Sequence, residues 1–255
     1  MSSWWPLLGA RAPEAAHPYY PLDVTVPFYE ANEAPVPMLL ASLAGMLGCA
    51  LLITALVACR VNPNMSWSSL AVFCWFITNG CLHCVFEGFF VLNHATVASS
   101  QNILAQLWKE YALSDSRYLT SDFFMLSVES ITVFIWGPLC FANAVSIMNN
   151  SALRHPLRVI ICMAHLYGVA LYYSTSLCEL YFTGRSHSRP EVLYFWVYYI
   201  GFNLPWAIVP SLLLIRSVQV ITRAMRLLDK MGETLSINRQ NKKLILGPRE
   251  PKKTK

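Results

Sequence analysis

Three ionisable side chains within long apolar stretches are the residues of this sequence best suited to chemistry. His83 and Glu87 are spaced i, i+4 in one stretch, and Glu129 lies in the next. The i, i+4 spacing places two side chains on one face of a helix. In an apolar pocket, carboxyl and imidazole groups favour their neutral forms, so one group can hold a proton while another accepts one. These residues therefore predict a site of proton transfer.

A structural interpretation of the same residues is a buried His–Glu pair that only ties two helices together. An ionised side chain at the centre of a membrane-spanning helix costs about 2.5 to 3.5 kcal/mol, so such residues normally face a bundle interior and mark a site. Three of them on two neighbouring helices favour the functional interpretation. Thr132 and Trp136, at i+3 and i+7 from Glu129, extend the same helical face.

A second polar group occurs in the last apolar stretch. Asn203 and Trp206 are spaced i, i+3, and Tyr199 precedes Asn203 by one turn. Pro205 removes the backbone hydrogen bond to the carbonyl of Gly201, which predicts a kink. Irregular backbone in a membrane helix often lines a cavity, and the π-face of an indole can stabilise a cation. We therefore expect Asn203 and Trp206 to line the cavity, although Trp206 could instead belong to an interfacial aromatic belt.

Other titratable residues in the apolar stretches give weaker signals. His165 either lines the cavity or is a hydrogen-bonded packing residue, and Glu179 is expected to reach water at a helix end. The eight cysteines all lie in apolar runs, which indicates small core residues rather than a disulfide framework. Cys81 and Cys84 form a C-x-x-C motif, but without a second Cys/His cluster the sequence predicts no metal site.

Composition predicts the elements that position these residues. The 255-residue chain is 55% apolar and only 13% charged, with a mean hydropathy of +0.43, whereas a soluble domain is about 25% charged. A membrane-spanning helix needs about 20 apolar residues. Five stretches qualify, at about 38–59, 70–92, 123–148, 159–182 and 192–214. The sequence therefore predicts an all-α membrane protein, a bundle of five transmembrane helices that encloses a cavity.

The segment 106–118, between the second and third helices, mixes aromatic residues with charges of both signs. It could be an amphipathic segment at the membrane interface. A folded lid over the cavity is favoured, because Asp115, Arg117 and Tyr118 can cross-link it.

Basic residues in the helix flanks predict the orientation, since Lys and Arg prefer the cytosolic side. Eleven of the nineteen Lys and Arg follow the last apolar stretch, which places the C terminus in the cytosol. The sequons at Asn64 and Asn149 then lie on cytosolic loops and should carry no glycan. The basic residues that share the cytosolic side are Arg60, Arg154, Arg158, Arg216, Arg223, Arg226 and Lys230.

These features divide the chain into three parts. We expect a lumenal N-terminal segment at 1–35, without a signal peptide, and a transmembrane domain at 36–218 whose first helix directs insertion. A basic cytosolic tail at 219–255 is expected to be disordered after about Lys230. Its Lys252 and Lys253 resemble the dilysine signal that returns membrane proteins to the endoplasmic reticulum, with attraction to anionic lipid as the alternative.

Several motifs, in order along the chain, carry a family resemblance. They are HPY (17–19), HCVFEGFF (83–90), LWKEY (107–111), DSRY (115–118), ESIT (129–132), WGP (136–138), HPLR (155–158), LYG (166–168) and the span 203–206. Together they resemble the emopamil-binding protein family, the sterol delta-8 to delta-7 isomerases with an EXPERA-type membrane domain. The likeness covers about residues 17–215.

The resemblance implies an endoplasmic reticulum enzyme with a sterol-sized cavity and no cofactor. In the family's chemistry C9 is protonated, a carbocation forms at C8, and a proton leaves C7. The resemblance makes Glu129 and His83 the donor and the acceptor, with Glu87 orienting or recharging His83. It assigns substrate binding and cation stabilisation to Thr132, Asn203, Trp206, Tyr111 and Tyr118.

Two positions depart from the family pattern, and they leave the exact sterol open. Val169 stands where an Asp often follows the Tyr–Gly pair, and Pro205 precedes the cavity Trp. The rivals to an enzyme are a binding or transport protein resembling the sigma-two receptor and a silent scaffold, but the complete acid–base set favours an enzyme. The expected partners are a sterol, the lipid bilayer and cationic amphiphilic inhibitors; a homodimer is left open, and no nucleic acid is expected.

Overall fold

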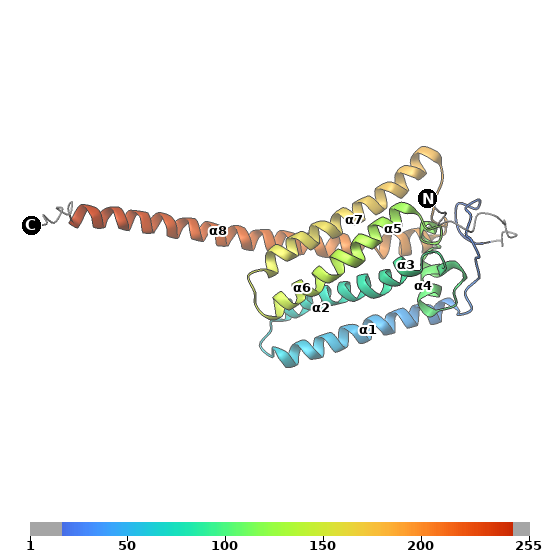
Figure 1. Cartoon of the computed structure of the whole chain (residues 1–255), viewed down its shortest axis with the longest axis horizontal. Helices are drawn as coiled ribbons and strands as arrows, with labels where there is room; N and C mark the ends of the chain where they lie inside the picture. Colours follow the sequence, from blue (N-terminus) through green and yellow to red (C-terminus); the bar gives the residue numbers. More distant parts are fainter. Residues whose placement is uncertain (1–16, 247–255) are drawn as a thin grey trace, which may run out of the picture.

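The structure, a computed structural model, describes residues 17–246, which contain helices and no strands. Five helical spans in this part of the chain are long and apolar enough to cross a membrane, which confirms the predicted fold class (Figure 1). They are α1 (Val36–Val61), Trp67–Asn93, Phe123–Met148, α7 (Arg154–Thr183) and the span that begins at Leu193.

Three of the five spans contain a wide π-helical stretch. The second runs through α2 (Trp67–Cys81), η1 (Leu82–Glu87) and α3 (Gly88–Asn93), and the third through α5 (Phe123–Ile131), η4 (Thr132–Trp136) and α6 (Gly137–Met148). The fifth runs through η5 (Leu193–Gly201) and α8 (Leu204–Leu246). Such stretches are frequent at functional sites because they displace side chains from the regular helical register.

Pro138 and Gly137 explain the wide stretch η4 and its close contact with η1. Pro138 has no N–H, and its ring clashes with the carbonyl four residues earlier, so the preceding turn widens. A Cβ atom on Gly137 would lie 2.5 Å from Cys84 Sγ and 3.2 Å from His83 Cβ. Only glycine therefore lets the two spans approach at the level of His83.

The segment between the second and third spans folds over one end of the bundle, as a lid (Figure 1). It consists of η2 (Val97–Ser99), α4 (Ile103–Tyr111) and η3 (Ser116–Leu119). Trp108 stacks on Phe86 with ring centroids 4.6 Å apart, and its Nε1 donates to the Phe86 carbonyl. Buried Lys109 donates from Nζ to the carbonyl of Glu30 at 2.9 Å, which ties the N-terminal segment to the lid.

A buried ion pair fixes the lid to the bundle. The Arg117 guanidinium donates to both carboxylate oxygens of Asp115, and its Nη1 donates to Thr175 Oγ1 on α7 at 2.9 Å. The side chains of Arg117 and Asp115 are 6% and 0% exposed. In such a pair each charge is balanced by its partner and by hydrogen bonds. If one partner is removed, the other remains buried with an uncompensated charge.

Arg117→Ala is therefore expected to destabilise the protein by about 3–5 kcal/mol, because Asp115 would stay buried without its partner. Thermal unfolding of the purified protein in detergent measures the loss as a lower Tm. The matched control is Arg185→Ala, which removes an ion pair to Asp23 whose side chains are 44% and 68% exposed. That control should leave Tm almost unchanged, because water and salt screen an exposed ion pair. Equal losses in the two variants would contradict a structural role for the buried pair.

Two details of the fifth span differ from expectation. The span breaks at Phe202 and Asn203, between η5 and α8, instead of kinking within one helix. Pro205 lies in the first turn of α8, where a missing N–H costs no helical hydrogen bond.

In the stretch after Lys230, where disorder was expected, the structure describes helix α8 as far as Leu246, and α8 projects beyond the bundle at the end opposite α4 (Figure 1). The sequence there is rich in good helix formers and contains no proline between Pro210 and Pro248. Lys252 and Lys253 lie outside the described residues.

Candidate active site

A cavity of about 620 Å³ lies within the bundle, between the lid and the membrane-spanning helices. Its volume is in the range of sites that hold a ligand of drug or sterol size. Most of its lining is apolar or aromatic. All eight residues predicted for the site line it: His83, Glu87, Tyr111, Tyr118, Glu129, Thr132, Asn203 and Trp206.

His83 is held between a carboxylate and a second imidazole. Its Nδ1 lies 2.9 and 2.8 Å from the two carboxylate oxygens of Glu87. Its Nε2 lies 3.1 Å from Nε2 of His165 on α7. The His83 side chain is 4% exposed, whereas that of Glu87 is 17% exposed. A carboxylate on Nδ1 fixes the ring orientation and leaves Nε2 to exchange a proton.

Glu129 lies on the neighbouring span and is held by the lid. The Tyr118 hydroxyl donates to Glu129 Oε1 at 2.9 Å. Burial raises the pKa of Tyr118 well above its usual value, and the nearby Glu129 charge raises it further, so this hydroxyl remains a donor. The carboxyls of Glu129 and Glu87 line the same cavity. Two carboxylates cannot both ionise cheaply in an apolar site, so the cluster is suited to retain a proton.

Trp206 is fixed by its indole nitrogen. Nε1 donates to Asn79 Oδ1 at 2.7 Å, and Asn79 Nδ2 donates to the Trp75 carbonyl. The Trp75 and Trp206 rings are tilted by 52° with centroids 6.0 Å apart. These contacts set the orientation of the Trp206 ring at the cavity wall.

Thr132 and Asn203 line the cavity, but the hydrogen bonds given for them do not reach His83, Glu87 or Glu129. The Thr132 hydroxyl donates to the Val128 carbonyl at 3.0 Å, within its own helix. Asn203 Nδ2 donates to the Tyr111 hydroxyl at 3.1 Å and to the Tyr199 carbonyl at 2.8 Å. The acid–base set is instead held by Tyr118 and His165.

Sequence reasoning left His165 open and missed Asn79 and the pair Glu110–Tyr198. Asn79 had a usable signal, because it precedes His83 by four residues on an otherwise apolar helix. The Tyr198 hydroxyl donates to Glu110 Oε1 at 3.2 Å, and both residues line the cavity. Burial raises the pKa of Glu110 above its usual value. The Glu110–Tyr198 pair gives the cavity a second polar site, on the lid side.

Glu179 lies apart from this cluster, as expected. Its carboxylate bonds Nε2 of His187 at 2.7 Å and is 38% exposed. Val169 and Pro205, the two departures from the family pattern, both line the cavity and so affect its shape directly.

The cluster can supply both halves of a proton transfer. One carboxyl and one imidazole lie on neighbouring spans around the same apolar space, and a third group orients the imidazole. A general acid and a general base placed in this way contribute about 10² to 10⁴-fold each to a reaction rate. An apolar wall also excludes water, which would otherwise capture a carbocation.

Comparison with known proteins supports the same chemistry. A family model described as EXPERA (EXPanded EBP superfamily) matches residues 103–217. The chain is 33% identical over 216 residues to the 3-beta-hydroxysteroid-Delta(8),Delta(7)-isomerase of Mus musculus, covering 84% of this chain and 92% of the relative. It is 31% identical over 223 residues to a probable 3-beta-hydroxysteroid-Delta(8),Delta(7)-isomerase of Arabidopsis thaliana, covering 87% and 96%.

A further relative has a different name. The chain is 32% identical over 164 residues to an isomeliandiol synthase of Melia azedarach, covering 64% of this chain and 75% of the relative.

Proposed function

Because this chain belongs to the EXPERA family, with relatives named 3-beta-hydroxysteroid-Delta(8),Delta(7)-isomerases, we propose that it is a sterol isomerase that moves a ring double bond from C8 to C7. The observation that supports this most directly is the placement of Glu129 and the His83–Glu87 pair around one apolar cavity. A protein that only binds or transports sterols has no need of two carboxyls and an imidazole at the ligand.

The reaction needs two proton transfers and no redox partner. Glu129 donates a proton to C9, so a C9–H bond forms and the carbon at C8 becomes cationic. His83 removes a proton from C7, and the electron pair of that C7–H bond forms the new double bond between C7 and C8. Glu87 stabilises the imidazolium and returns the proton toward Glu129. The protein ends in its starting state.

The remaining cavity residues bind the substrate and stabilise the cation. Trp206, fixed by Asn79, presents its ring to the developing charge at C8. Tyr118 holds Glu129 in place, and the Asn203–Tyr111 pair and Thr132 shape the wall around the sterol. A cationic amine with apolar rings should inhibit, because it resembles the carbocation between Glu129 and Trp206.

Complementation of a cell that lacks sterol Δ8,Δ7-isomerase tests this function. Wild type is expected to clear the accumulated Δ8 sterol, whereas His83→Ala and Glu129→Gln, expressed to the same level, should leave it. Sterols are identified by gas chromatography with mass spectrometry. Wild type that leaves the Δ8 sterol, or variants that clear it equally well, would refute the enzymatic assignment.

The protein is a multi-pass membrane protein, and we place it in the endoplasmic reticulum with a lumenal N terminus and a cytosolic C terminus. At the proposed cytosolic end His155 Nδ1 at the start of α7 lies 3.4 Å from Ser217 Oγ on α8, and the neighbours of these two residues in the sequence include Arg154 and Arg216. The positive-inside preference supports this orientation.

The orientation predicts that neither Asn64 nor Asn149 is glycosylated. Treatment with a glycosidase should therefore leave the electrophoretic mobility of the expressed protein unchanged. A sequon introduced into the lumenal loop near Ser186 provides the positive control. A mobility shift that disappears in Asn64→Gln or Asn149→Gln would reverse the orientation.

A further inference from the structure

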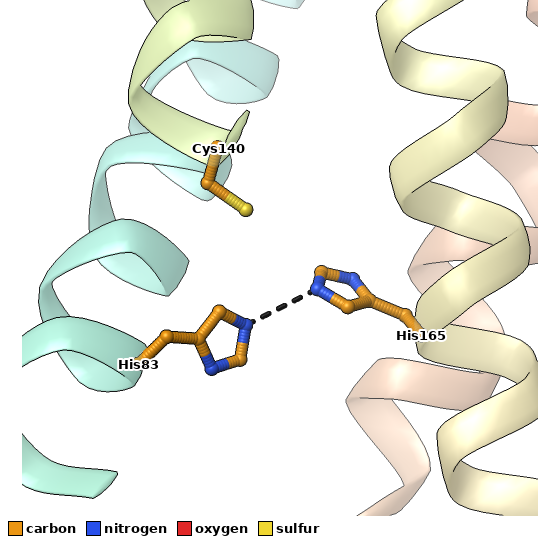
Figure 2. Close-up of side chains that lie close together, drawn as sticks. All are labelled: His83, Cys140 and His165. Carbon is orange, nitrogen blue, oxygen red and sulfur yellow. Dashed lines mark hydrogen bonds between the residues drawn. The ribbon is translucent and has the colours of Figure 1, made fainter. Parts of the chain in front are cut away.

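Three buried side chains from three spans converge on one point beside the cavity. They are His83 on η1, Cys140 on α6 and His165 on α7, and Figure 2 shows the cysteine directed toward the space between the two rings. One imidazole nitrogen of each histidine and the Cys140 Sγ all lie within 4.8 Å of one another. Cys140 has no role in the proposed proton transfer between Glu129 and His83.

This donor set is typical of a zinc site. Imidazole nitrogen and thiolate sulfur are the ligands that Zn²⁺ prefers, at about 2.0–2.1 and 2.3 Å. In a tetrahedral site, two such nitrogens lie about 3.4 Å apart. The two Nε2 atoms are already 3.1 Å apart, so small rotations of the side chains would admit the ion.

The surroundings compensate the charge of a bound ion. Loss of the Sγ–H proton to solvent leaves a thiolate on Cys140, and Glu87 supplies a second negative charge through its bond to His83 Nδ1. These two negative charges together neutralise the charge of a divalent cation. An unneutralised charge would be costly in an apolar interior. A carboxylate on the far nitrogen of a ligating histidine also fixes the ring and strengthens the ligand. His165 Nδ1 has no hydrogen-bond partner, so that nitrogen can carry the proton while Nε2 binds the ion.

We propose that His83, Cys140 and His165 bind a single zinc ion and that its binding switches the isomerase off. The effect on activity rests on the proposed function, because a bound ion occupies the Nε2 of His83 that accepts the sterol proton. His83 and His165 both line the cavity, so the ion can enter by the same route as the substrate. An occupied cavity should therefore slow metal binding.

Cobalt binding to the purified, reduced full-length protein in detergent tests the site itself. Metal-free wild type should bind one equivalent of Co²⁺ and show a thiolate-to-cobalt charge-transfer band. Cys140→Ser should lose that band. The matched control is Cys162→Ser, which replaces another fully buried cysteine, on α7, that is outside the cluster and should keep the band. Absence of the band in wild type, or its persistence in Cys140→Ser, would overturn the proposal.

Inhibition by zinc tests the consequence. Zn²⁺ should inhibit wild type and Cys162→Ser reversibly, with activity restored by a chelator. Cys140→Ser should retain activity without metal and require at least about tenfold more Zn²⁺ for inhibition, because a lost ligand weakens binding by more than 1.4 kcal/mol. Equal inhibition of Cys140→Ser would overturn the switch. Metal-free wild type that shows the cobalt band but does not isomerise sterol would instead refute the proposed function.

Discussion

Glu129→Gln is expected to lower kcat for the Δ8 sterol by about 10² to 10⁴-fold, because an amide cannot donate the proton that C9 requires. The substitution preserves shape, and Gln can still accept the hydrogen bond that Tyr118 donates to Oε1. Sterol binding should change little, since the substrate is uncharged. A cationic amine inhibitor should bind about tenfold or more weakly, because an amide cannot supply the carboxylate that Glu129 becomes once it has given up its proton.

The matched control for Glu129→Gln is Glu179→Gln. It makes the same chemical change at a carboxylate that bonds His187 at the end of α7, outside the cavity lining. That variant should retain activity and amine affinity. A similar loss of kcat in both variants would show that the effect of Glu129→Gln is not specific to the cavity, and unchanged kcat in Glu129→Gln would exclude Glu129 as the acid.

His83→Gln is expected to cost a similar factor of about 10² to 10⁴ in kcat, since the group that takes the C7 proton is removed. Glu87→Gln should cost less. Its side-chain oxygen can still accept from His83 Nδ1, at the position of the 2.9 Å contact, but the charge that stabilises the imidazolium is lost. The measurement is kcat and KM for both variants over a range of pH.

The relative size of these two losses identifies the base. With His83 as the acceptor, Glu87→Gln keeps measurable turnover and an altered pH profile, while His83→Gln falls close to background. A larger loss in Glu87→Gln than in His83→Gln would instead make Glu87 the acceptor and His83 the residue that positions it. Comparable Tm values for the two variants show that neither loss comes from unfolding.

Composition and periodicity were enough to predict the five spans and the helical faces that carry His83, Glu129 and Asn203, whereas Tyr111 and Tyr118 were assigned to the cavity by the family resemblance. Apolar runs of about 20 residues indicated the spans, because a helix of about that length is needed to cross the hydrocarbon core of the bilayer. The i, i+4 spacing placed His83 and Glu87 together, and their side chains are bonded. These predictions depend only on local sequence and on the solvent.

The contacts between distant spans could not be predicted in the same way. His165 is 82 residues from His83, and Asn79 is 127 residues from Trp206. Whether such pairs meet depends on how each helix is rotated about its axis, and the wide stretches η1 and η5 change that rotation in the second and fifth spans. Hydrophobic periodicity assumes a regular helix, so it carries no information about either feature.

The most direct test of proton transfer in the cavity is one turnover in D₂O. Excess purified protein, equilibrated in D₂O so that its carboxyl and imidazole protons have exchanged, is mixed with an unlabelled Δ8 sterol. The product is analysed by mass spectrometry and NMR. We predict a Δ7 sterol with one deuterium at C9, even if the proton from C7 is later recycled within the cluster. A Δ7 sterol without deuterium at C9, or recovery of unchanged Δ8 sterol, would contradict this account.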